Sequence, residues 1–142
     1  MRGMIRIAAI GLAFCALGPA AAQESGWHAR LSTVPIDPSL TDTIAGHGEA
    51  SAELAGKELR ITGTFTGLKG PATIAQLRVS PYVGVRGQPI ADLTVSPATE
   101  GSVSGSVELT PEQIEALRGG RLYIQIHSQT APEGNLWGWL VQ

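Results

Sequence analysis

Charged residues and cysteines are scarce in this chain of 142 residues. Only 15% of the residues are charged and 43% are hydrophobic, so we expect a packed core rather than a disordered chain. The length fits one domain. The single cysteine, Cys15, lies in an apolar run near the amino terminus. The rest of the chain can therefore form no disulfide and has no thiolate to act as a nucleophile or a metal ligand.

Clusters of positive charge are also missing. Apart from Arg2 and Arg6, the basic residues occur singly, and these eight basic residues face twelve acidic ones, which gives a formal charge of −4. Binding to nucleic acid requires a positive face that neutralises several phosphates. We therefore expect no nucleic-acid partner.

The amino terminus has the three-part pattern of an export signal. Two arginines precede the apolar run IAAIGLAFCALG, and Ala20 and Ala22 occupy the positions that a signal peptidase reads. The run has about 12 residues, whereas a membrane-spanning helix needs ~20. We expect residues 1–22 to be cleaved as a signal peptide. Residues 23–142 would then form a single domain in the periplasm or outside the cell, with no membrane span.

Alternation of apolar and polar residues dominates the remaining chain and predicts half-buried β-strands. In RLYIQIHS, the apolar face consists of Leu122, Ile124 and Ile126. The same alternation occurs in WHARLSTV, GEASAELAG, KELRITGTFTGL, TIAQLRV, PIADLTVS, SVSGSVEL and NLWGWLV. Two segments rich in Pro and Gly, PIDPSLTDTIAGHGEA and SPYVGVRGQPI, lack it and are expected to be surface loops. About eight short strands predict an all-β fold with two packed antiparallel sheets.

One segment, LTPEQIEALRGG, predicts a short helix before the last two strands. Thr110 can cap its amino end together with Gln113, and Pro111 fits the first helical position because its missing N–H is not needed there. The two glycines that follow can end the helix. We expect Ile114 and Leu117 to pack over one end of the sandwich.

Catalytic motifs are not evident. The three histidines, His28, His47 and His127, have no local spacing that suits a metal, and no serine lies in a Gly-x-Ser-x-Gly turn. We therefore expect a non-enzymatic protein without a metal or other cofactor. Separate strands could still bring ligands together around His127, so a metal-dependent periplasmic enzyme or a metal-binding protein is the alternative. Otherwise His127 would hydrogen-bond to the turn that follows it.

The carboxyl-terminal segment LTPEQIEALRGGRLYIQIHSQTAPEGNLWGWL resembles the end of the CHRD (chordin-type) domain. The family pattern has a Leu-x-x-Gly-x-Leu-Tyr-x-x-x-His strand, a Pro-x-Gly turn and a final Gly-containing strand. The matching positions are Leu117, Gly120, Leu122, Tyr123, His127, Pro132, Glu133, Gly134 and Gly138. The segments ARLSTVPIDPSLTDTIAGHGEASAEL and FTGLKGPATIAQLRV are similar to earlier parts of the family. The resemblance implies an exported, immunoglobulin-like β-sandwich and no established enzymatic role.

The chain departs from the family pattern at two places. The usual Ala-His-Ile-His strand is replaced by Ala75, Gln76, Leu77 and Arg78, and the closing Arg-Gly-Gln by Trp137, Gly138 and Trp139. A family metal site, if one exists, would lack two of its three histidines here.

These replacements suggest a binding patch on one face of a sheet. If the strands that carry them are neighbours, the patch would consist of Gln76, Arg78, Tyr123, Gln125, His127, Trp137 and Trp139. Tyr, Trp and Arg are enriched at binding hot spots. The last strand could instead bury its tryptophans inward and turn Leu136 and Leu140 outward, which would leave a purely structural domain. The partner expected for the patch is an envelope protein or glycan.

Overall fold

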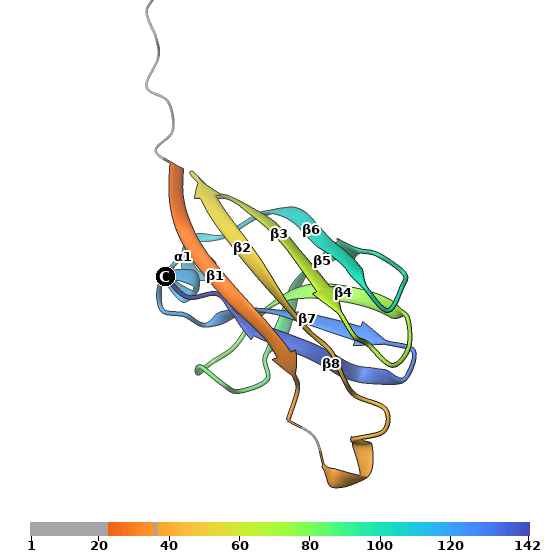
Figure 1. The fold of residues 1–142 in the computed structure, drawn as a ribbon. Coiled ribbons are helices and arrows are strands. Elements are labelled where there is room, and N and C mark those ends of the chain that lie inside the picture. Colours follow the sequence, from red (N-terminus) through yellow and green to blue (C-terminus); the bar gives the residue numbers. More distant parts are fainter. Residues whose placement is uncertain (1–22, 36) are drawn as a thin grey trace, which may run out of the picture.

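A computed structural model describes residues 23–35 and 37–142, and the predicted signal peptide, residues 1–22, lies outside this part (Figure 1). The described residues form eight strands, one α-helix and one 3-10 helix. The strands are β1 (Gln23–Thr33), β2 (His47–Ala55), β3 (Glu58–Thr66), β4 (Ala72–Val79), β5 (Gln88–Val95), β6 (Gly101–Glu108), β7 (Leu122–Ser128) and β8 (Ala131–Trp139). The helices are η1 (Pro38–Leu40) and α1 (Pro111–Arg118). The predictions of an all-β fold and of a helix before the last two strands are confirmed.

The strands close into a barrel with the order β1-β2-β3-β6-β5-β4-β7-β8, and every neighbouring pair is antiparallel. The prediction of an immunoglobulin-like sandwich is therefore wrong. Two short seams close the ring, with the pairs Thr94–Ser104 and Val95–Val103 between β5 and β6, and Ser32–Trp137 and Thr33–Leu136 between β1 and β8. Alternation identifies the inward face of a strand in either architecture, whereas closure depends on these few pairs, of which those between β1 and β8 are far apart in the chain.

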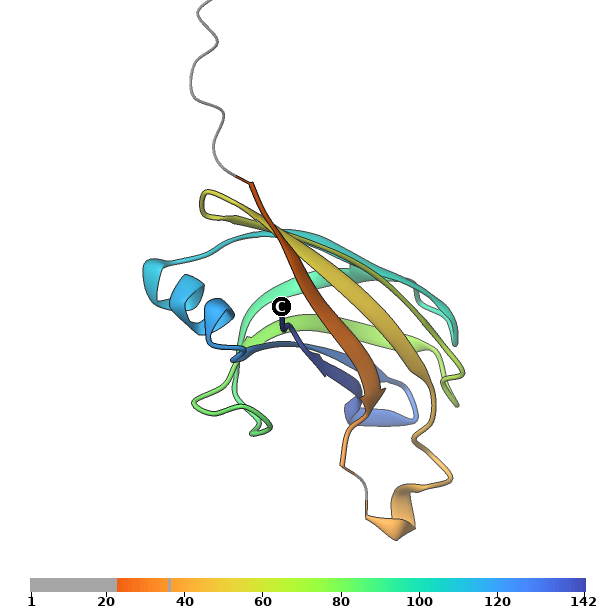
Figure 2. The same cartoon turned by 60° about the vertical axis from the view of Figure 1, so that its left-hand side comes forward.

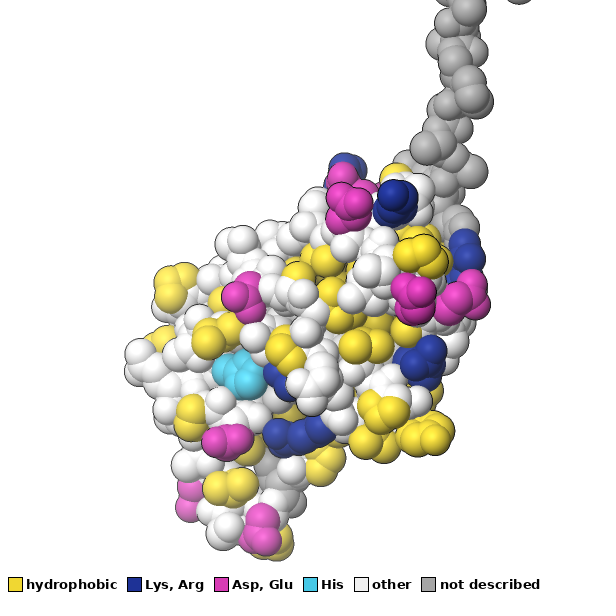
Figure 3. Space-filling view, turned by 180° about the vertical axis from the view of Figure 1, so that it is seen from behind, with side chains coloured by type: hydrophobic (Ala, Val, Ile, Leu, Met, Phe, Trp, Pro, Cys, Tyr) yellow, Lys and Arg dark blue, Asp and Glu magenta, His cyan; other side chains and the backbone are white. Residues whose placement is uncertain are grey.

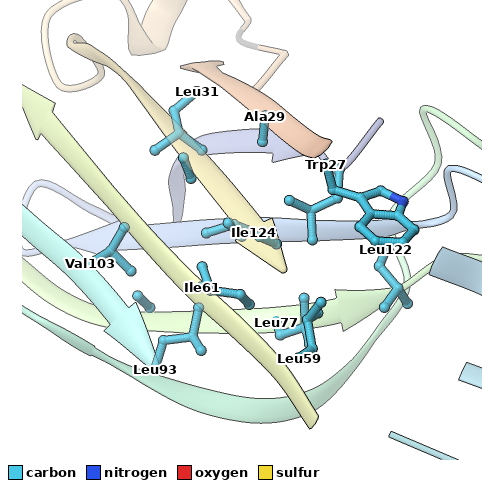
Figure 4. Packing of buried hydrophobic residues seen from close by; sticks show 14 of the residues in the cluster. Trp27, Ala29, Leu31, Leu59, Ile61, Leu77, Leu93, Val103, Leu122 and Ile124 are labelled. Atoms are coloured by element: carbon cyan, nitrogen blue, oxygen red, sulfur yellow. The ribbon is translucent and has the colours of Figure 1, made fainter. Parts of the chain in front are cut away.

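The inward side chains fill the barrel. Figure 4 shows residues from opposite sides of the ring pointing into one interior, among them Trp27, Leu31, Ile61 and Leu122. None of these four side chains is more than 1% exposed. Leu122, Ile124 and Ile126 are fully buried, as the alternation of their segment predicts. The interior is therefore a packed core that holds the strands in place.

Helix α1 lies at one end of the barrel (Figure 2). The Thr110 hydroxyl accepts a hydrogen bond from the Gln113 N–H at 3.2 Å, and the Gln113 side chain accepts one from the Thr110 N–H at 2.9 Å. This reciprocal capping is the predicted one and satisfies two backbone donors that have no partner inside the helix. Leu117 is fully buried and Ile114 packs against the core, so the helix covers this end of the barrel as expected.

Candidate functional site

Strands β4, β7 and β8 are neighbours, so the predicted patch residues come together on their outer face. Gln76, Gln125 and Trp137 lie in one row across the three strands, and Arg78, Tyr123 and Trp139 lie in the next. His127 follows, opposite Ile74 of β4. We call this surface the aromatic face, defined by Gln76, Arg78, Tyr123, Gln125, His127, Trp137 and Trp139. The register gives them one common face, as the patch hypothesis requires, while binding by them stays a prediction.

The last strand turns its leucines inward. Leu136 and Leu140 are fully buried in the core, whereas Trp137 and Trp139 lie on the outer face and are half-buried. The alternative with inward tryptophans is therefore wrong. The tryptophans are only partly accessible, however, because they pack against other side chains of the same face.

Three aromatic rings form a cluster on this face. The ring centroids of Tyr123 and Trp139 are 4.4 Å apart, and those of Tyr123 and Trp137 are 6.0 Å apart in an edge-on arrangement. The two tryptophan rings are 5.9 Å apart. Such contacts stabilise by ~0.5–1.5 kcal/mol beyond the burial of area. Tyr123 is completely buried, although its side chain points out of the barrel.

The loop from Ser80 to Gly87 is held onto this face by Arg78 and Tyr123. The Tyr123 hydroxyl accepts a hydrogen bond from the Gly87 N–H at 2.8 Å and one from Arg78 Nε at 3.2 Å. Arg78 Nη2 donates to the Gly87 carbonyl at 2.9 Å. Both backbone groups of Gly87 are thus bound by side chains of the sheet. These bonds fix the end of the loop, immediately before β5.

The guanidinium of Arg78 donates its hydrogen bonds to neutral acceptors. Its Nη1 donates to Gln76 Oε1 at 2.7 Å, and Gln76 Nε2 in turn donates to Asp92 Oδ1 at 3.0 Å. Gln76 therefore lies between the guanidinium and the nearest carboxylate of this chain of hydrogen bonds. Arg78 therefore anchors the loop, and Gln76 holds the Arg78 side chain in place.

The other polar residues of the aromatic face bind the hairpin between β7 and β8. His127 Nδ1 lies 2.9 Å from the Pro132 carbonyl, and Gln125 Nε2 donates to the Glu133 carbonyl at 3.2 Å. A carbonyl can only accept, so Nδ1 of His127 carries the proton. This is the hydrogen bond to the following turn that the sequence suggested for His127. Its Nε2 is buried and has no hydrogen-bond partner among the described residues.

The tip of the loop carries a group of exposed apolar side chains that the sequence analysis did not single out. Tyr82, Val83 and Val85 are 73%, 60% and 47% exposed. The segment was predicted to lie on the surface because of its prolines and glycines. The missed signal is the presence of three large apolar residues within four positions of such a loop. Figure 3 shows hydrophobic side chains gathered at the lower right edge of the molecule, beside basic ones.

This apolar tip has a defined backbone. The Val85 N–H donates to the Tyr82 carbonyl at 3.2 Å, and Gly84 has a φ of +82°, as the third position of a type II turn requires. The Ser80 hydroxyl accepts from the Tyr82 N–H at 3.2 Å and contacts the carbonyls of Tyr82 and Val85. The turn therefore presents its three apolar side chains in a fixed arrangement.

Across residues 23–35 and 37–142, no group of three His, Cys, Asp or Glu side chains is placed to hold a metal ion. In the same ranges, no helix is long and apolar enough to cross a bilayer.

Comparison with known proteins gives one family. Searches of curated proteins and of solved structures find no match. The CHRD domain family matches residues 28–140, which covers all eight strands wholly or in part together with α1. This match extends over far more than half of the chain and agrees with the strand, turn and glycine pattern at its carboxyl end. The chain therefore belongs to the CHRD domain family.

Proposed function

We propose that this protein is an exported, non-catalytic binding module that contacts a protein of the cell envelope through its apolar tip. The observation that carries the proposal is the exposure of Tyr82, Val83 and Val85 on a turn with a fixed backbone. Exposed apolar groups of this kind favour association because burying them removes apolar surface from water. A preformed turn also lowers the conformational entropy lost on binding.

The surroundings of the tip support contact with a protein. Arg86 lies next to it and donates to the Glu133 carbonyl at 3.0 Å, which ties the loop to the hairpin between β7 and β8. The half-buried Trp137 and Trp139 lie on the same outer face, where their rings pack against that of Tyr123. Tyr, Trp and Arg are the residues that most often dominate the energetics of protein interfaces.

A non-catalytic role is supported by what the polar groups of the aromatic face do. Arg78, Tyr123 and Gln125 use their hydrogen bonds to hold backbone groups of the loop and the hairpin. None of these bonds joins a nucleophile to a base, which is the arrangement that covalent catalysis requires. These groups act as a scaffold for the surface above them.

Site-specific cross-linking in the native envelope tests the proposal. A photoreactive amino acid at Val83 should capture one defined envelope protein, while the same group at the exposed Ser106 on β6 should not. In a second experiment the photoreactive amino acid replaces Tyr82. The double substitution Val83→Ser and Val85→Ser should then abolish capture of that protein from position 82. Equal capture from Val83 and Ser106 would show that the tip is not the contact surface.

Export has its own test. If residues 1–22 are a signal peptide, the intact mass of the protein recovered from outside the cytoplasm should correspond to residues 23–142. Recovery of the full 142 residues, or of a lipid-modified chain, would refute this part of the proposal.

A further inference from the structure

A second surface lies on the other side of the barrel, away from the aromatic face. The outer faces of β1, β2 and β3, which run side by side in Figures 1 and 2, line an open hollow of about 1170 Å³. Pockets for small molecules are typically ~300–1000 Å³, so this hollow has room for an extended ligand. Its outward lining residues are His28, Arg30, His47, Glu49, Ser51, Thr62, Thr64 and Thr66.

Strand register arranges these side chains in three rows. His28 is opposite Ser51, which is opposite Thr62. The second row contains Arg30, Glu49 and Thr64, and the third contains His47 and Thr66. Neighbouring strands are ~4.8 Å apart and successive outward residues ~7 Å apart, so the rows form a regular grid of polar groups.

The glycines beneath this grid make the strands approach closely. A Cβ on Gly63 would lie 2.6 Å from the Glu49 carbonyl oxygen, and one on Gly48 would lie 2.2 Å from the Thr64 carbonyl oxygen. Neither position can take a side chain without a shift of the backbone. The close approach of β2 and β3 under the grid therefore depends on Gly48 and Gly63.

Most of the strongly polar side chains in the hollow are not used inside the protein. Arg30 and Glu49 are directly opposite each other, yet they form no ion pair within the described part of the chain. Within that part, His28, His47 and Thr64 also have no side-chain hydrogen bond. All five residues are exposed. Their donors and acceptors are available to a ligand.

The chemistry of these groups points to a neutral ligand with many hydroxyl groups. Arg30 only donates, Glu49 only accepts, and the threonine and histidine side chains can do both. The opposite charges of Arg30 and Glu49 cancel, so the hollow favours neither an anion nor a cation. A sugar hydroxyl both donates and accepts, and it matches such a mixed set.

A protein segment fits this hollow less well. No large apolar side chain of the described residues is exposed within it, because the exposed ones are Leu40, Ile74, Tyr82, Val83, Val85 and Val141. Apolar and aromatic anchors are what protein interfaces depend on. Strand addition to β2 or β3 is also blocked, since both strands are paired along their length on both sides.

We infer that the hollow over β1, β2 and β3 is a binding site for a neutral oligosaccharide or polysaccharide chain. This inference is independent of the protein contact proposed for the apolar tip, which lies in the loop between β4 and β5.

A titration with neutral oligosaccharides tests the inference. The purified domain of residues 23–142 is titrated at pH 7.5, and binding is monitored through the chemical shifts of its backbone amides. The probes are linear hexamers of glucose and linear tetramers of N-acetylglucosamine. At least one probe should bind saturably and shift amides around Arg30, Glu49 and Thr64. The substitutions Thr64→Val and Glu49→Gln should each weaken binding at least fivefold. Thr94→Val, at an exposed threonine of β5 outside the hollow, should leave it unchanged.

Three outcomes would overturn the inference. The first is no binding of any probe tighter than ~10 mM, which is ten times weaker than a millimolar affinity. The second is a set of shifts confined to residues 80–87. The third, in parallel titrations with a sulfated and an amine-bearing polymer, is binding of those polymers only, since that would show that charge rather than hydroxyl groups is recognised. A far-ultraviolet circular dichroism spectrum of each variant identifies loss of folding separately.

Discussion

The hydroxyl of Tyr123 is 2.8 Å from the backbone nitrogen of Gly87, and this hydrogen bond links the centre of a sheet to a loop that projects from it. Because Tyr123 is fully buried, the bond is shielded from water. The same hydroxyl also accepts from Arg78, so one phenol oxygen organises both the strand and the loop. The position of the apolar tip therefore depends on a side chain that no partner can reach.

Replacing Tyr123 with Phe should destabilise the protein and loosen the loop. The partly buried Gly87 N–H and the Arg78 guanidinium would lose an acceptor, at a cost of ~1–3 kcal/mol in the free energy of unfolding. Urea unfolding measures this cost, and amide hydrogen exchange at Gly87 reports the loop. The matched control is Tyr82→Phe, since Tyr82 is 73% exposed and should tolerate the change. Equal effects of the two substitutions would contradict the role given to Tyr123.

Truncating Leu122 to Ala should cost ~2–5 kcal/mol in the free energy of unfolding, because it leaves a cavity in a packed core. Leu122 is fully buried inside the barrel, and this chain has no disulfide among residues 23–142 to offset the loss. Thermal and urea unfolding of the two proteins provide the measurement. The control is Val83→Ala, at a position that is 60% exposed. A cost below ~1 kcal/mol for Leu122→Ala would mean that the core tolerates the cavity by collapsing.

The substitution His127→Gln should lower thermal stability modestly. The histidine ring binds the Pro132 carbonyl at 2.9 Å, and loss of such a bond costs ~0.5–1.5 kcal/mol. Elemental analysis of the purified protein should find no stoichiometric metal in either form. Stoichiometric zinc or copper that disappears in His127→Gln would instead support a metal site at this residue.

Acidification should loosen the 3-10 helix η1. Asp37 accepts a hydrogen bond from the Ser39 N–H at 2.9 Å, and this bond lowers the pKa of the carboxyl below its ordinary value of 3.8. A lowered pKa in the folded state means that the contribution is present above the ordinary value and is lost as the pH falls through the folded pKa. The NMR chemical shift of the Asp37 carboxyl carbon should titrate with a midpoint below pH 3.8. The chemical shift of the Ser39 amide should change with the same midpoint. A midpoint above 3.8 would contradict this hydrogen bond in solution.

The inward faces of the strands could be predicted from the sequence because burial follows a period of two. Leu122, Ile124 and Ile126 are examples. The capped helix could also be predicted, because Thr110 and Gln113 cap it through hydrogen bonds between residues close in the sequence. Ring closure could not be predicted in this way. It depends on pairs such as Ser32 with Trp137, which are far apart in the chain and have no local signature.

The candidate site shows the same division. The common face of Tyr123, Trp137 and Trp139 follows from alternation once the strands are neighbours. That Tyr123 is buried by a loop, and that Arg78 holds this loop, depends on where residues 80–87 fold back. Loop paths of this kind are set by a few specific hydrogen bonds rather than by a repeating pattern.

The short seam between β5 and β6 leaves most of β5 with a free edge, since only Thr94 and Val95 pair with β6. Exposed strand edges can recruit other chains and start aggregation. The free part of β5 begins with the exposed Gln88 and Pro89 and also carries the exposed Asp92. A proline offers no N–H to an added strand, and a carboxylate resists burial against one. The barrel is thereby protected from growing into larger sheets at one of the two short seams of its ring.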